Sequence, residues 1–430
     1  MPVPAPIDPP SHPARPVRVV PAVVMQHIED VAVLHAQRTV LSGEHVTLSY
    51  LRRFDDRLAA HLDGLNVMGE AAWPLCQQEL EMGTAGAMFA AAIRAVSDRR
   101  LDRLEELCAL AETLPETQAG LISALGWVEP AMLRGLVVPL LGSSDVLRRT
   151  LGIAASALHR LDPGLLSARR LEDPEPVARA RALRTAGEIG KVESLSALAN
   201  TINDEDPVCQ AWGAWSAVLL GNRQAALEFL KAAAFADGPV QPRAFQLAML
   251  ALPVPDADAL LQTIARDPAK RRVLVQGAGL IGDPAYVPWL IELMADDALA
   301  RVAGEAFHLI TGADLALLDL ERNAAEAATG PNDDPEDENV TMDEDDSLPW
   351  PDPRLVQAWW TQHGARFASG TRHLVGSPMT RHQCIDVLKN GYQRQRRAAA
   401  YHLCLLSPGT PLFEWRAPAW RQQRELAQLS

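Results

Sequence analysis

The sequence predicts an all-α protein, an α-solenoid of stacked helical hairpins followed by a helical C-terminal module. Turns marked by aspartate recur every 28 to 33 residues between Asp145 and Asp297. Apolar residues between these turns follow the three-to-four spacing of amphipathic helices. No stretch alternates Val, Ile or Thr with polar residues over the length of a strand. A period of about 30 residues is typical of helical hairpins that are stable only when stacked.

The N-terminal part of the chain begins with a proline-rich stretch. Proline lacks an amide hydrogen and interrupts helices, so residues 1–22 are predicted to be a disordered tail. Helical spacing begins near Val24. A second amphipathic helix begins near Leu48 and is expected to end by Gly64, because glycine commonly terminates helices. Residues 23–83 are therefore assigned to an N-terminal helical region.

The repeats are assigned to residues 84–320, with weaker units over 84–112 and 115–142. Each unit pairs a first and a second helix. The first helix commonly ends at a glycine and carries a small residue near its end, which lets neighbouring helices approach closely. The turn aspartates are Asp145, Asp173, Asp206, Asp237, Asp267 and Asp297. The glycines are Gly190, Gly221, Gly282 and Gly312, and the small residues are Ser156, Ala186, Ala217, Ala248 and Ala278. His308 replaces the small residue in the last unit.

Beyond the repeats, the charge of the chain separates into two blocks. Residues 321–353 are assigned to an acidic linker, in which 333–346 hold nine carboxylates and no base. Residues 354–430 contain eleven Arg or Lys and three Asp or Glu, and are assigned to a basic helical module rich in Trp and Arg. The acidic run is interpreted as a solvated hinge. Our hypothesis is that it gates the basic module or contacts a cation, through Asp333, Asp334, Asp337, Glu338, Asp343, Asp345 and Asp346.

The basic module supplies the candidate partner-binding residues. Arg394, Arg396 and Arg397 could contact phosphate or an acidic protein, although an ordinary helix surface is the competing interpretation. Trp359 and Trp360 are neighbours and cannot both face one core from a helix, so one of them is expected to reach another surface. Trp415 is the third aromatic candidate.

The motifs that suggest chemistry are better explained by packing. Gly277, Gly279 and Gly282 form a GxGxxG pattern, but they fall in repeat register and lack the strand that a dinucleotide site needs. Two His-x-Cys pairs occur in the basic module, and residues two apart point to different sides of a helix. No catalytic residue, metal site or cofactor is predicted.

Composition narrows the function classes further. The net charge of −14 and the pI of about 5.3 argue against a general nucleic-acid binder. No apolar run reaches the length of a membrane span, and the first residues lack the pattern of a signal peptide. Five cysteines without a CxxC motif suit a reducing cytoplasm.

The repeats resemble short HEAT repeats of the phycobilisome-lyase type, clearly over 145–312 and weakly over 84–142. Nearly the whole chain resembles a family of bacterial HEAT-repeat proteins that are often encoded near type VI secretion genes, beside spike and adaptor components. The segments that carry this resemblance are HLDGL (61–65), SALGW (123–127), AWSAVLLGN (214–222), AGEAFHLITGADLALLDLE (303–321), GPNDDPEDE (330–338), LPWPDP (348–353), GYQRQR (391–396) and LFEWRAP (412–418).

The resemblance implies a cytoplasmic, non-enzymatic scaffold for protein–protein interaction, acting as an adaptor or chaperone in type VI secretion. Its partner would be a spike, effector or adaptor component, bound on the concave face of the solenoid. One alternative is a lyase-like or isomerase-like enzyme built on HEAT repeats, which would need a pocket with convergent polar groups. Another is an immunity-type protein that binds a single toxin.

Overall fold

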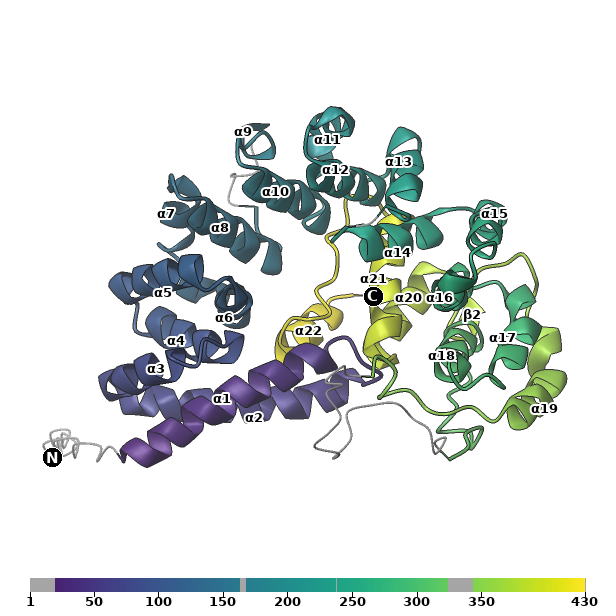
Figure 1. Cartoon of the computed structure of the whole chain (residues 1–430), viewed down its shortest axis with the longest axis horizontal. Coiled ribbons are helices and arrows are strands. Elements are labelled where there is room, and N and C mark those ends of the chain that lie inside the picture. Colours follow the sequence, from purple (N-terminus) through teal and green to yellow (C-terminus); the bar gives the residue numbers. More distant parts are fainter. Residues whose placement is uncertain (1–19, 163–167, 237, 324–342, 430) are drawn as a thin grey trace, which may run out of the picture. The chain divides into compact units, whose positions relative to one another are not determined.

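The computed structural model describes residues 20–162, 168–236, 238–323 and 343–429. Regular structure in these ranges is almost entirely helical, which confirms the predicted all-α solenoid (Figure 1). Contacts divide the chain into two units. The first unit comprises the residues up to His35 together with Arg57–Leu121, and the second comprises Ala36–Asp56 together with the residues from Ile122 onward.

The first unit contains the N-terminal helices. Helices α3 (Trp73–Leu80), α4 (Ala85–Ser97) and α5 (Leu101–Thr113) belong to it, and α3 and α5 both pack on α4. Three helices contribute residues to both units: α1 (Pro21–Leu41), α2 (Leu48–Met68) and α6 (Gln118–Trp127).

The expectation that the second helix ends at Gly64 is wrong, because α2 continues to Met68. Gly64 is needed for packing and not for termination. A Cβ atom at Gly64 would lie 2.8 Å from Nε2 of His27 on α1.

The second unit is built on a stack of helical hairpins and the C-terminal module. The first helices of the hairpins are α8 (Val146–Leu158), α10 (Pro176–Glu188), α12 (Pro207–Leu219), α14 (Gln241–Ala251), α16 (Arg271–Ile281) and α18 (Ala300–Thr311). Between them lie the second helices α9 (Ala168–Leu171), α11 (Leu195–Asn200), α13 (Ala225–Ala233), α15 (Val254–Ile264) and α17 (Val287–Leu293), and α7 (Val137–Gly142) precedes α8.

The C-terminal module contains the helices α19 (Pro353–His363), α20 (Arg381–Asn390), α21 (Gln393–Leu406) and α22 (Ala419–Leu426). Two strands of two residues, β1 (His373–Leu374) and β2 (Ser377–Pro378), pair antiparallel with His373 opposite Pro378. The sequence did not predict this hairpin.

Successive first helices pack directly on one another, from α8 to α18. The small residues predicted for this contact between helices are buried: Ala217, Ala248 and Ala278 are at most 1% exposed. The GxGxxG pattern lies in α16 and at its C-terminus, and a Cβ on Gly279 would lie 2.9 Å from Ala306 on α18. Close helix packing therefore explains this motif.

Some aspartates of the repeat turns cap the helix that follows. Asp145 accepts a hydrogen bond from the backbone amide of Arg148, and Asp206 accepts one from Cys209. Asp173 does not cap α10, because this unit is two residues longer and α10 begins at Pro176. Its carboxylate instead pairs with Arg149 of the preceding first helix. Asp237 lies outside the described residues.

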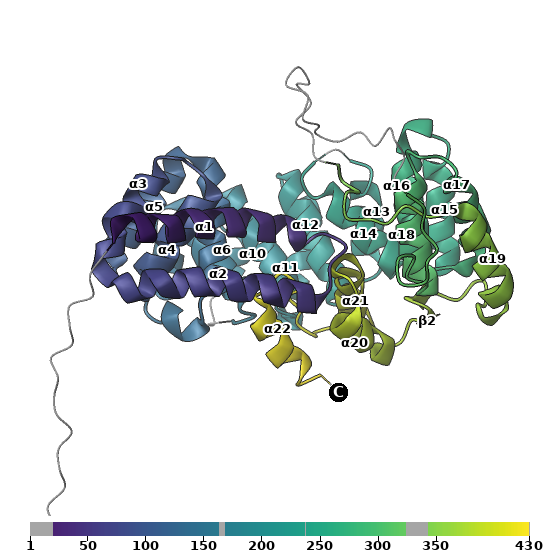
Figure 2. The ribbon, with the colours of Figure 1, turned by 90° about the horizontal axis from the view of Figure 1, so that it is seen from below.

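The C-terminal module runs along the turns that follow the first helices, which we call the turn row (Figure 2). The amide of His373 donates to the carbonyl of Gly282, and the amide of Leu412 donates to that of Glu188. The guanidinium of Arg372 donates to the carbonyls of Met249, Leu250 and Leu252. These groups satisfy carbonyls that a helix leaves unpaired at its C-terminus, where the helix dipole also favours positive charge.

Glycines of the turn row are required both by their backbone conformation and by this docking. Gly282 has a φ of +72° and Gly312 a φ of +69°, in the left-handed region that glycine tolerates best. A Cβ on Gly282 would also collide with the carbonyl oxygen of His373, and one on Gly312 would collide with Val375. Glycine therefore recurs at these turns of the sequence because the C-terminal module packs against them.

We predict that Gly282→Ala destabilises the second unit by about 2–5 kcal/mol. Left-handed strain accounts for about 1–2 kcal/mol, and the collision with His373 adds about 1–3 kcal/mol. Gly135→Ala is the matched control, because Gly135 also has a positive φ but has no atom within 4 Å of an added Cβ. Urea unfolding measures both variants. Equal losses would contradict the proposed docking of the module on the turn row.

Candidate functional site

A cavity of about 670 Å³ lies in the second unit, between the first helices and the C-terminal module. Its walls come from α10, α12, α14, α16 and α18 on one side, and from α21 and the segment 412–416 on the other. Seven arginines and five glutamates line it, together with aromatic and glutamine side chains. Residues that are distant in the sequence therefore form one strongly charged site.

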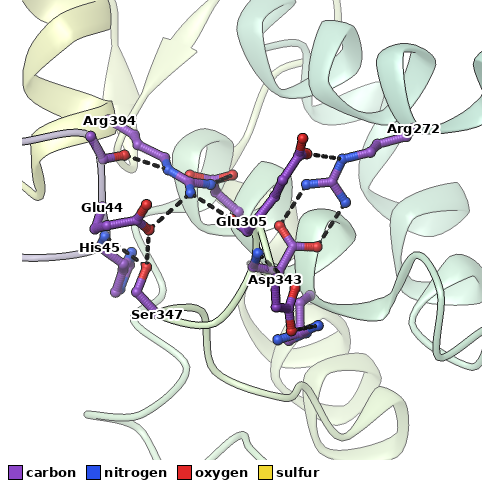
Figure 3. A network of polar contacts seen from close by, with 11 residues as sticks. Glu44, His45, Arg272, Glu305, Asp343, Ser347 and Arg394 are labelled. Carbon is purple, nitrogen blue, oxygen red and sulfur yellow. Dashed lines mark hydrogen bonds and ion pairs between the residues drawn. The ribbon is translucent and has the colours of Figure 1, made fainter. Parts of the chain in front are cut away.

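Arg394 on α21 is the centre of the network at one end of this cavity (Figure 3). Its guanidinium pairs with Glu305 on α18 at 3.0 Å and with Glu44 at 3.1 Å. It also donates to the carbonyls of Gly43 and Glu344. Arg394, a partner-binding candidate of the sequence analysis, thus joins the C-terminal module to α18 and to the segment between α1 and α2.

The described part of the acidic run binds mainly to the repeats. Asp345 forms two hydrogen bonds with Arg272 on α16, and Asp343 pairs with Arg301 on α18 at 2.6 Å (Figure 3). Its contact with the basic module is through the backbone of Glu344, which accepts from Arg394. Asp346 is exposed. Four of the candidate carboxylates, Asp333, Asp334, Asp337 and Glu338, lie outside the described residues.

A second cluster of charges surrounds Glu188 at the end of α10. Glu188 is 4% exposed and pairs with Arg181 at 2.9 Å and Arg184 at 2.7 Å. Burial opposes ionisation of this carboxyl, but the two guanidiniums prevail and lower its pKa to about 2. Nearby, Arg160 pairs with Glu414 of the segment 412–416 at 3.0 Å.

Three further arginines of the cavity have no carboxylate partner among the described residues. They are Arg243 on α14, Arg397 on α21 and Arg416. Burial lowers the pKa of Arg243 and of Arg397, and the positive charge of Arg416 acts in the same direction on both. Seven arginines against five glutamates leave the cavity lining with an excess of two positive charges.

The other predicted partner-binding residues are placed differently. Arg396 is completely buried, where it donates to the carbonyl of Leu388 and to the amide oxygens of Gln393 and Gln422. It joins α20, α21 and α22 and has no free surface. Arg397 and Trp415 line the cavity and are partly buried.

Trp359 and Trp360 lie together at the end of the repeats and not at the cavity. Trp359 packs edge-on against Phe307 of α18, with ring centroids 5.6 Å apart. Trp360 stacks on Phe367 at 5.5 Å. Both rings are partly buried, so each combines packing within the protein with some exposure to solvent.

Buried histidines lie beside the Arg394 network. His45 stacks on Tyr392 with ring centroids 3.6 Å apart, and His308 lies edge-on to Tyr392 at 5.7 Å. The hydroxyl of Tyr392 donates to Asp314 at 2.6 Å. Burial lowers the pKa of His45 and of His308 to about 4, so both rings are neutral at pH 7.

Comparison with known protein families identifies the repeats. The model of the HEAT-repeat family matches residues 163–250, which cover α9 to α14 and the cavity-lining residues Glu188 and Arg243. Residues 163–250 are therefore similar to HEAT repeats. No curated protein and no solved structure matches the chain. Among the described residues, no helix has the length and apolar composition needed to cross a membrane.

Sequence reasoning did not find most of the cavity. Arg243, Tyr401 and Glu305 come from three helices separated by more than fifty residues, and only the folded array brings them together. One local signal was present. Arg181, Arg184 and Glu188 lie within two turns of each other in α10.

We predict that the second unit loses stability as the pH falls from 7 to 5. His45 and His308 have folded-state pKa values of about 4, below the ordinary value of 6.5, so the unfolded chain binds more protons between pH 6.5 and pH 4. Each histidine is expected to cost about 1–2 kcal/mol at pH 5.

Urea unfolding at both pH values measures this loss, and His308→Gln is expected to reduce it. His382 is exposed and provides the control variant, His382→Gln. A loss that is the same in the two variants would contradict the assignment to His308.

Proposed function

We propose that this protein is a non-enzymatic scaffold that binds another protein, and that it acts in the bacterial cytoplasm as an adaptor or chaperone for type VI secretion. HEAT repeats generally mediate protein–protein interactions, and the stack of helical hairpins is the observation that carries this proposal. The type VI assignment rests on the sequence resemblance. A spike, effector or adaptor component is the proposed partner.

The position of the C-terminal module restricts how such a partner binds. Backbone and arginine contacts of the module already occupy the turn row and part of the surface of α12 and α14. These contacts reduce the surface of the repeats that is open to a partner, while the concave face remains the partner site that the sequence analysis predicts. The partner would bind to the remaining exposed surface of the repeats.

An enzyme is the second candidate, and the cavity is the observation that favours it. Its volume is in the range of small-molecule sites, and polar groups converge on it. Burial raises the pKa of Glu305 although Arg394 acts in the opposite direction. A carboxyl with a raised pKa in a cavity is typical of a general acid.

We predict that Glu305→Gln leaves partner binding unchanged within about twofold. The amide keeps the size of the carboxyl and can still accept from Arg394, but it cannot transfer a proton. Tagged wild-type and variant chains are expressed in the native host, and type VI components are quantified by mass spectrometry after capture.

Equal enrichment of one spike, effector or adaptor component by both chains supports the scaffold. Enrichment no greater than with an unrelated HEAT-repeat protein would contradict it. A turnover that the wild type catalyses and Glu305→Gln abolishes would favour the enzyme.

A further inference from the structure

We propose that the cavity binds a small organic anion with at least two negative charges, a phosphate ester or a polycarboxylate, held by Arg243, Arg397 and Arg416. This site is independent of the proposed scaffold function. It would be present whether or not a protein partner binds elsewhere on the repeats.

The charge balance of the cavity is the first support. Each lining glutamate lies within 4 Å of an arginine: Glu44 and Glu305 near Arg394, Glu188 near Arg184, Glu344 near Arg272 and Glu414 near Arg160. Arg243, Arg397 and Arg416 remain, with no carboxylate partner among the described residues. Placing several unpaired cations around a partly buried cavity is costly unless an anion neutralises them.

Unused hydrogen-bond donors in the same cavity are the second support. Nε of Arg397 is buried and has no hydrogen-bond partner among the described residues, and the same is true of the indole Nε1 of Trp215. Tyr401 is 2% exposed and also lines the cavity. Buried donors in native proteins are almost always satisfied, so these atoms indicate a ligand or water that accepts from them.

The walls of the cavity indicate an organic ligand and not a bare inorganic ion. Phe245, Leu280 and Leu309, which come from the repeats, contribute apolar side chains to the lining. A volume of about 670 Å³ lies in the range of sites for small organic molecules. The ligand would therefore place its charged groups on the arginines and its carbon skeleton against these apolar side chains.

The arginines come from both parts of the second unit. Arg243 belongs to α14 in the repeats, whereas Arg397 and Arg416 belong to the C-terminal module. An anion between them would remove their mutual repulsion and strengthen the contact of the module with the repeats. Binding is therefore expected to raise the Tm of the second unit.

Isothermal titration calorimetry of the full chain tests the site with two probes, inorganic pyrophosphate and citrate, at constant ionic strength. We expect saturable binding of one anion per chain. Tighter binding of pyrophosphate would assign the site to phosphate esters, and tighter binding of citrate would assign it to polycarboxylates. Arg397→Gln is expected to raise the Kd at least about tenfold, equivalent to about 1.4 kcal/mol, and to abolish the rise in Tm.

Arg271→Gln is the matched control, because Arg271 is an exposed arginine of α16 that pairs with Asp296 and does not line the cavity. It is expected to bind the anion like the wild type. Arg416 is exposed, so Arg416→Gln repeats the test without a change in a buried side chain. The proposal is overturned if neither anion binds saturably, or if Arg397→Gln and Arg416→Gln bind as tightly as Arg271→Gln.

Discussion

Unpaired carbonyl groups at the ends of the first helices are the constraint on which the second unit depends. Unpaired carbonyls recur in every hairpin, because each first helix ends in a turn with unsatisfied acceptors at the negative end of its helix dipole. The C-terminal module supplies the donors, from the amide of Leu412 on α10 to the amide of Val375 on α18. Some of its positive side chains also bind carbonyls within the protein: Arg372 donates to Leu252 and Arg396 donates to Leu388.

Docking of the module creates the candidate site. A rod of hairpins alone would leave Arg184, Arg243 and Glu305 on an open surface, where water would solvate them. The helix α21 and the segment 412–416 cover that surface and add Arg397, Tyr401 and Arg416. The result is a partly closed cavity with more cations than carboxylates, in which electrostatic interactions are stronger than at a surface.

Periodic features of the sequence predicted the fold well, and local features predicted the site poorly. The repeat of Asp, small residue and Gly identified the hairpins because helix capping, close helix packing and left-handed turns recur along the repeats. The same patterns could not show that Gly282 approaches His373, or that Arg396 is buried while Arg416 is exposed. The contact of Gly282 with His373 joins segments that are distant in the sequence. The burial of Arg396 depends on how α20, α21 and α22 pack together.

Native-state hydrogen exchange of the full chain tests the central claim most directly. The amides of His373, Val375, Gly376 and Leu412 donate to carbonyls of the repeats. If the module is part of the repeat fold, these amides should exchange as slowly as those in the last turns of α10, α16 and α18, and they should open together with them. Exchange of these four amides at the rate of an unstructured peptide, while the repeat helices stay protected, would contradict the account.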